Sequence, residues 1–153
     1  MMTQFDCPGS AGKSRQAVPA ENTLKFFTER GVRVAEIVTP MVREGVRNHF
    51  KCSSLEGAAL QNQHTSEGAC WGSHWEARLF ETDLMSPVAS HFTVYSNLTL
   101  ALFEDSGWYK ADYRYSQSAL WGKNGGCKFA KGNRDGALAQ TRRPNSSMIS
   151  TYR

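Results

Sequence analysis

The chain has 153 residues, 40% of them hydrophobic and 21% charged, with a formal net charge of +4. This length allows one domain with a real core. The basic excess lies mainly near the two ends and is not interleaved with aromatic residues on one element, so no nucleic-acid binding is expected. No stretch approaches the about 20 apolar residues of a membrane span. We expect no signal peptide in the first residues and no anchor signal in the last.

The N-terminal half predicts short elements. Residues 1–22 are rich in Gly, Ser, Pro and Gln, and we expect a disordered lead-in. Residues 23–30 predict a short helix, with Thr23 as N-cap and Gly31 just past its end. The β-branched run 32–38 predicts a strand.

Two longer helices follow. Thr39 is the expected cap of a helix that starts at Pro40, and Met41, Val42, Val46 and Phe50 form its apolar stripe. Residues 53–71 predict a polar loop with a short helical turn near 55–60. A helix capped by Ser96 should end before Gly107. Its residues are apolar on nearly all sides, so we expect it to be buried.

The remaining chain is less regular. Residues 108–115 predict an aromatic-rich extended segment, and Gly122, Gly125 and Gly126 predict tight turns ahead of Cys127. Residues 130–153 predict a disordered basic tail. The expected fold class is α+β and mainly helical, with irregular loops and disordered ends.

The four cysteines are Cys7, Cys52, Cys70 and Cys127. Because no pair has C-x-x-C spacing, a cysteine-based zinc site is not expected. Two interpretations stay open at this point, which are reduced thiols of a cytosolic protein and disulfides of a secreted one.

The most informative stretch is Ser73-His74-Trp75-Glu76, followed by the turn Asp83-Leu84-Met85-Ser86-Pro87. A lone His with a Met-containing turn about a dozen residues later is typical of metzincin-type zinc proteases, where the His is the third metal ligand and the Met packs beneath it. The other part of such a site, H-E-x-x-H, is absent from the 153 residues.

Several blocks together resemble the leishmanolysin family, the zinc metalloproteases of trypanosomatid surfaces and their relatives. The blocks stand in the family's order, which makes the resemblance strong over residues 26–129. They are residues 26–31, 38–40 with 42–43, 49–57, 72–78, 83–87, 95–101 with 103–109, 111–113 and 121–127.

The resemblance implies a metzincin-like lower, C-terminal catalytic subdomain over residues 23–129. It implies a zinc metalloendopeptidase that hydrolyses protein or peptide substrates, with His74 as the third zinc ligand and Met85 as the Met-turn residue. It also implies a Cys52–Cys127 disulfide. Family membership further implies a cell-surface, membrane-associated or secreted protein, with host or matrix proteins as further partners.

The chain also departs from the family pattern. The H-E-x-x-H positions should fall near residues 14–20, where the sequence reads Ser-Arg-Gln-Ala-Val-Pro-Ala, with no His, no general-base Glu and a helix-breaking Pro19. We therefore expect an incomplete chain that is inactive alone and does not hold zinc tightly. His64, Cys70 and His74 could form an improvised zinc site. The alternative function is a non-catalytic surface adhesion or interaction fragment of the same fold.

One modification motif is independent of the zinc site. Asn97-Leu98-Thr99 fits the N-x-[ST] pattern of N-glycosylation, so Asn97 is a candidate acceptor.

Overall fold

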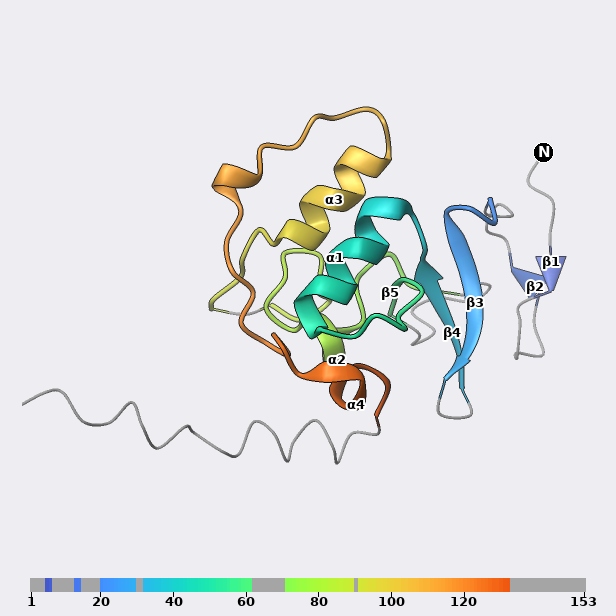
Figure 1. Ribbon diagram of the computed structural model, residues 1–153. Helices are drawn as coiled ribbons and strands as arrows, with labels where there is room; N and C mark the ends of the chain where they lie inside the picture. The colour runs from blue at the N-terminus through green and yellow to red at the C-terminus, as the bar shows by residue number, and fades with distance from the viewer. Residues whose placement is uncertain are drawn as a thin grey trace, which may run out of the picture.

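The computed structural model describes residues 5–6, 13–14, 20–29, 32–61, 71–89 and 91–132. Within them lie four α-helices, a short 3-10 helix, a three-stranded sheet and a separate pair of two-residue strands (Figure 1). The fold class is α+β, as expected. The pair β1 (Phe5–Asp6) and β2 (Lys13–Ser14) is antiparallel and falls within the expected lead-in. Most of that lead-in lies outside the described residues, so its disorder stays a prediction.

The sheet has the order β3-β4-β5 and is antiparallel throughout. Strand β3 spans Leu24–Glu29, β4 spans Val32–Ile37 and β5 spans Ala58–Ala59. The register pairs Leu24 with Ile37 and Glu29 with Val32, which leaves two residues between the strands. The strand predicted at 32–38 is confirmed, and the helix predicted at 23–30 is wrong.

The helical turn expected near 55–60 is also wrong, because residues 58–59 join the sheet as β5. Gly57 explains why this is possible. A Cβ atom at Gly57 would lie 2.3 Å from the carbonyl oxygen of Ile37, so only glycine allows the chain to pass this close to β4. The pairing of Ile37 with Ala58 follows directly from that approach.

Helix α1 spans Pro40–Phe50 with Pro at its first turn, and its prediction is confirmed. Thr39 holds the N-cap position but its side chain makes no cap hydrogen bond. The carboxylate of Asp105 caps the helix instead, since it accepts hydrogen bonds from the backbone N–H groups of Met41 and Val42, each at 3.0 Å. A carboxylate at a helix N-terminus is favoured by both the unsatisfied N–H groups and the helix dipole.

Helix α3 spans Asn97–Asp105, and its cap is as predicted, because the Ser96 hydroxyl accepts from the N–H groups of Leu98 and Thr99. Gly107 follows the helix with a φ of 73° and donates to the carbonyl of Glu104. Only one face is buried, with Leu98, Thr99 and Ala101 inside and Phe103 44% exposed. The expectation of burial on nearly all sides is therefore corrected.

Two short helices and a 3-10 turn complete the described part. Helix α2 spans Ala77–Phe80 and α4 spans Gly126–Lys131. The aromatic segment expected to be extended contains the 3-10 helix η1, Tyr113–Tyr115. Because Ala130 and Lys131 belong to α4, the boundary predicted at residue 130 falls inside this helix, and residues 133–153 of the expected tail lie outside the described residues.

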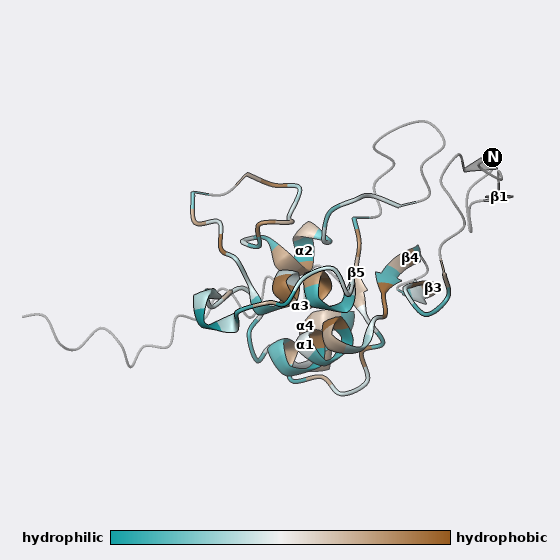
Figure 2. Ribbon diagram, turned by 90° about the horizontal axis from the view of Figure 1, so that it is seen from above, coloured by the Kyte–Doolittle hydropathy of each residue, from teal (hydrophilic) through white to brown (hydrophobic). Residues whose placement is uncertain are grey.

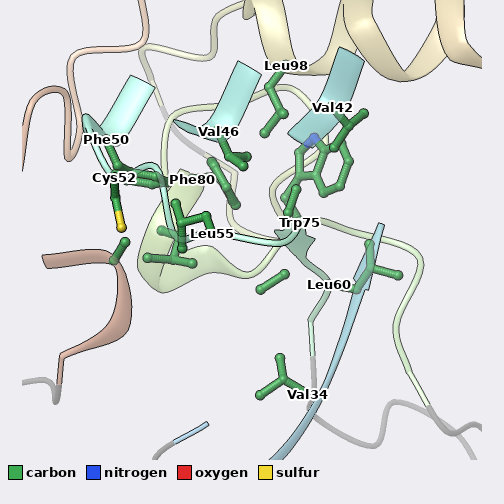
Figure 3. Packing of buried hydrophobic residues seen from close by; sticks show 14 of the residues in the cluster. Val34, Val42, Val46, Phe50, Cys52, Leu55, Leu60, Trp75, Phe80 and Leu98 are labelled. Atoms are coloured by element: carbon green, nitrogen blue, oxygen red, sulfur yellow. The ribbon is translucent and has the colours of Figure 1, made fainter. Parts of the chain in front are cut away.

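The core lies where α1, α2, α3 and the sheet edge meet, and Figure 2 shows hydrophobic residues concentrated around α2 and α3. Trp75 is its largest fully buried side chain. Figure 3 shows the Trp75 indole beside Val42 of α1, with Leu60 on the side toward the sheet. The tryptophan that follows His74 is thus an anchor of the whole core.

Candidate functional site

His74 lies on a segment that extends the sheet beyond β5. The N–H of Gln61 donates to the carbonyl of His74 at 2.8 Å, and the N–H of Glu76 donates to Ala59 at 2.9 Å. A β-bridge between Leu60 and Trp75 lies between these two bonds. Residue alternation along this segment buries Trp75 and leaves His74 exposed. The sheet therefore presents the His74 imidazole on the surface.

One ring nitrogen of His74 has a partner. Its Nδ1 lies 3.2 Å from the side-chain oxygen Oε1 of Gln61. Because an amide oxygen only accepts, this orientation of Gln61 assigns the hydrogen to Nδ1 and leaves Nε2 with the lone pair. Histidine ligands of metals commonly donate their second ring N–H to a carbonyl or carboxylate in this way. The local geometry of His74 suits a ligand.

Met85 is joined directly to the segment that bears His74. The carbonyl of Met85 accepts the N–H of Trp75 at 2.9 Å. The turn around Met85 is closed by Asp83, whose carboxylate accepts the Met85 N–H at 2.8 Å and whose carbonyl accepts the Ser86 N–H at 2.9 Å. The Met85 side chain is half-buried and packs against the core. His74 and the Met85 turn are therefore held in fixed register.

Asp83 is the centre of this arrangement and was not singled out from the sequence. Its carboxylate is buried, at 3% exposure, and accepts hydrogen bonds from the hydroxyls of Ser96 and Thr99, the latter at 2.6 Å. Thr99 in turn accepts from the indole Nε1 of Trp75 at 3.0 Å. An Asp at the start of a turn commonly bonds the backbone two residues on, so the Asp83–Met85 bond had a local sequence signal. The bonds to α3 had none.

A cleft of about 420 Å³ lies between α1, α2, the start of α3 and residues 113–123, and Asp83 and Ser96 are among the residues that line it. His74 and Met85 do not line it. His49 does, and its Nε2 donates to the carbonyl of Trp121 at 2.8 Å. Burial lowers the pKa of His49, so its imidazole is held neutral. Glu44 and Lys123 provide charged groups at the cleft.

The described residues do not by themselves provide a zinc site. No group of three or more His, Cys, Asp or Glu side chains suited to a metal occurs within 20–29, 32–61, 71–89 and 91–132 or the two short strands. Zinc takes about four ligands, and His74 provides at most one. His64 and Cys70, the other members of the improvised site, lie outside the described residues.

A disulfide joins Cys52, just after α1, to Cys127 in α4. This is the pair that the resemblance predicts. Arg78 of α2 strengthens the same region, because its guanidinium donates to the carbonyls of Phe129 and Ala130 at 3.1 and 2.7 Å. Gly122 allows the close packing there, since a Cβ at this position would lie 2.5 Å from the Phe129 ring. The end of the described chain is thereby fixed to the core.

None of the helices in the described ranges is long and apolar enough to cross a membrane.

Comparison with known proteins gives a family. The profile described as Leishmanolysin matches residues 14–136. A leishmanolysin-like peptidase of Caenorhabditis elegans is 48% identical over 94 residues, which cover 61% of this chain and 14% of that protein.

Two further relatives match a longer part of the chain. A leishmanolysin homolog of Crithidia fasciculata is 34% identical over 119 residues, covering 70% of this chain and 18% of the relative. A ciliated left-right organizer metallopeptidase of Mus musculus is 32% identical over 127 residues, covering 81% of this chain and 17% of the relative. The chain thus spans less than one fifth of the length of these relatives.

Proposed function

The chain belongs to the leishmanolysin family of metallopeptidases, and from this we propose that it forms the part of a zinc metalloendopeptidase that carries the third metal ligand, His74, and the Met-turn residue, Met85. In this proposal, residues 23–129 are a metzincin-like C-terminal catalytic subdomain that acts on protein or peptide substrates. Zinc supplies Lewis-acid chemistry when all of its ligands are present.

The hydrogen bond from the Trp75 N–H to the Met85 carbonyl carries the proposal. It holds the residue after the candidate ligand beside the candidate Met-turn, and the family motif has the third His followed by a Met-turn in this order. The Nδ1–Gln61 contact of His74 supports the same role, because it leaves Nε2 as the coordinating atom.

We further propose that these 153 residues are inactive alone. They contain no H-E-x-x-H, and so they offer neither the other two His ligands nor the general-base Glu. Loss of a general base alone costs about 10²–10⁴ in rate.

The proposed location is the cell surface or the secreted fraction, because the Cys52–Cys127 disulfide requires an oxidising compartment.

A chimera tests this function. The segment of the Caenorhabditis elegans relative that matches this chain is replaced by the corresponding residues of this chain, and hydrolysis of a peptide substrate is measured beside the isolated chain. We expect the chimera to hydrolyse the peptide in a zinc-dependent manner and the isolated chain to show no hydrolysis. Zinc-dependent hydrolysis by the isolated chain, abolished by His74→Ala, would overturn the proposed inactivity.

The exposed aromatic side chains favour a second candidate, a non-catalytic surface that binds host or matrix proteins. Trp108 and Tyr115 are 86% and 78% exposed, and aromatic residues are enriched in the cores of protein–protein interfaces. Binding of the isolated chain to immobilised matrix proteins, lost in a Trp108→Ser/Tyr115→Ser variant, would support it. If the chimera does not hydrolyse the peptide while the isolated chain binds matrix proteins, the binding function is favoured over the enzyme.

A further inference from the structure

We propose that Asn97 is an N-glycosylation site, occupied when the chain enters a eukaryotic secretory pathway, and that its oligosaccharide projects from the rim of the cleft between α1 and α3. The proposal does not depend on the zinc-site function. It depends on the accessibility of one side chain, on the disulfide, and on the motif Asn97-Leu98-Thr99.

Asn97 is exposed although its neighbours are buried. It is the first residue of α3, and Ser96, Leu98 and Thr99 are each less than 9% exposed. The helix turns these three residues inward, so Asn97 faces solvent. A bulky, hydrophilic oligosaccharide on the Asn97 amide therefore leaves the core unchanged. Asn97 also lines the cleft, which places the attached sugar at its rim.

The Thr of the motif is fully buried, at 1% exposure, and its hydroxyl is engaged with Asp83 and Trp75. The transferase must read this hydroxyl together with the Asn amide, so the motif is accessible only before α3 packs. Transfer must therefore precede folding of this region. Asp83 and Trp75, which engage the Thr99 hydroxyl, come earlier in the chain than α3, whereas Cys127 of the disulfide and Phe129 of the core come after it.

The compartment is indicated by the Cys52–Cys127 disulfide, which forms in the oxidising lumen where oligosaccharide transfer also takes place. In the transfer, the Asn97 amide nitrogen forms a bond to the anomeric carbon of a lipid-linked oligosaccharide. The bond from that carbon to the diphosphate oxygen breaks, the lipid diphosphate leaves, and the amide nitrogen loses one proton.

The test is translation of the full chain, fused to a cleavable secretory leader, in the presence of endoplasmic-reticulum microsomes. Protease protection identifies translocated chains, so the result does not require that the product be secreted. We expect the translocated wild-type chain to gain a mobility shift that peptide-N-glycosidase removes. Asn97→Gln should lose the shift assigned to this position.

Asn145→Gln is the matched control, because Asn145-Ser146-Ser147 is the chain's other N-x-[ST] motif. It should leave the Asn97 shift in place, and Thr99→Ser should retain some modification because a hydroxyl remains. Translocated, protease-protected chains with no glycosidase-sensitive shift, or a shift removed by Asn145→Gln and unaffected by Asn97→Gln, would overturn the proposal. Neither result bears on the hydrolysis measured with the chimera.

Discussion

The indole nitrogen of Trp75 donates a 3.0 Å hydrogen bond to the hydroxyl of Thr99, and this bond joins the residue after His74 to helix α3. The Thr99 hydroxyl in turn donates a hydrogen bond to the carboxylate of Asp83, which also accepts the N–H of Met85. The candidate ligand segment, the Met85 turn and α3 are thus parts of one buried hydrogen-bond network. Such networks specify one arrangement when all their members are satisfied.

Thr99→Val should destabilise the fold by about 2–3 kcal/mol, because it leaves the Trp75 indole N–H without its acceptor and Asp83 without one donor, both buried. Urea denaturation of the bacterially expressed chain measures this. Thr28→Val is the matched control, since Thr28 is exposed on β3 and valine suits a strand. Equal effects of the two substitutions would show that the network does not stabilise the fold.

Asp105→Ala should lower the free energy of unfolding by about 1–2 kcal/mol, because Asp105 caps α1 from 64 residues away. Thr39→Val should have little effect, because the Thr39 hydroxyl makes no cap bond. Thermal unfolding of both variants measures the difference. If Thr39→Val costs more stability than Asp105→Ala, the assigned cap is wrong.

This cap shows what the sequence can and cannot predict. The local signals of α1 and α3 were sufficient, since Pro40, Ser96 and Gly107 act through their own neighbours. The group that satisfies the N–H of Met41 comes from the end of another helix, and no local pattern reveals it.

The error at 23–30 has a physical reason as well. Thr23 and Gly31 resemble helix ends, but Phe26, Phe27 and Thr28 favour a strand, and pairing with β4 decides the conformation.

At the site, the motif was sufficient to select His74 and Met85 as candidates. Asp83 and Thr99 were missed because their importance arises from contacts between segments. The ligand role of His74 itself stays a prediction.

Glu36 should make stability depend on pH. It lies on β4 at 4% exposure, and burial, with smaller contributions from Glu29 and Glu56, raises its pKa from 4.5 to about 7. The folded state therefore binds a proton that the unfolded state has lost, and the free energy of unfolding falls as pH rises from about 4.5 to 7. Between these pH values the free energy of unfolding should fall by about 3 kcal/mol less in Glu36→Gln than in the wild type.

Urea denaturation across that pH range measures the effect, with the exposed Glu21→Gln as control. His49 contributes with the opposite sign, because its lowered pKa reduces stability as pH falls below about 6.5. The difference between wild type and Glu36→Gln isolates the Glu36 contribution. An identical pH slope in the two proteins would contradict the assignment.

Replacing both Cys52 and Cys127 by alanine should cost about 4 kcal/mol, the chain-entropy value for a crosslink that closes a loop with a sequence separation of 75. Urea denaturation of the wild type and the double variant, both without added reductant, measures the difference in the free energy of unfolding. Because the other two cysteines are unchanged in both proteins, the difference reports on this disulfide. Hydrogen exchange should show that α4 loses protection first, since the disulfide and Arg78 hold it to the core. Unchanged stability of the double variant would contradict this role of the disulfide.

The central claim is that His74 is a zinc ligand, and the most direct measurement is the zinc content of the purified chimera with the Caenorhabditis elegans relative. The chimera with the native His74 should hold one equivalent of zinc. His74→Ala should lose most of it, while His91→Ala should retain it, because His91 is exposed and lies outside the His74–Met85 arrangement. A His74→Ala chimera that folds and binds zinc as tightly as the parent would contradict the claim.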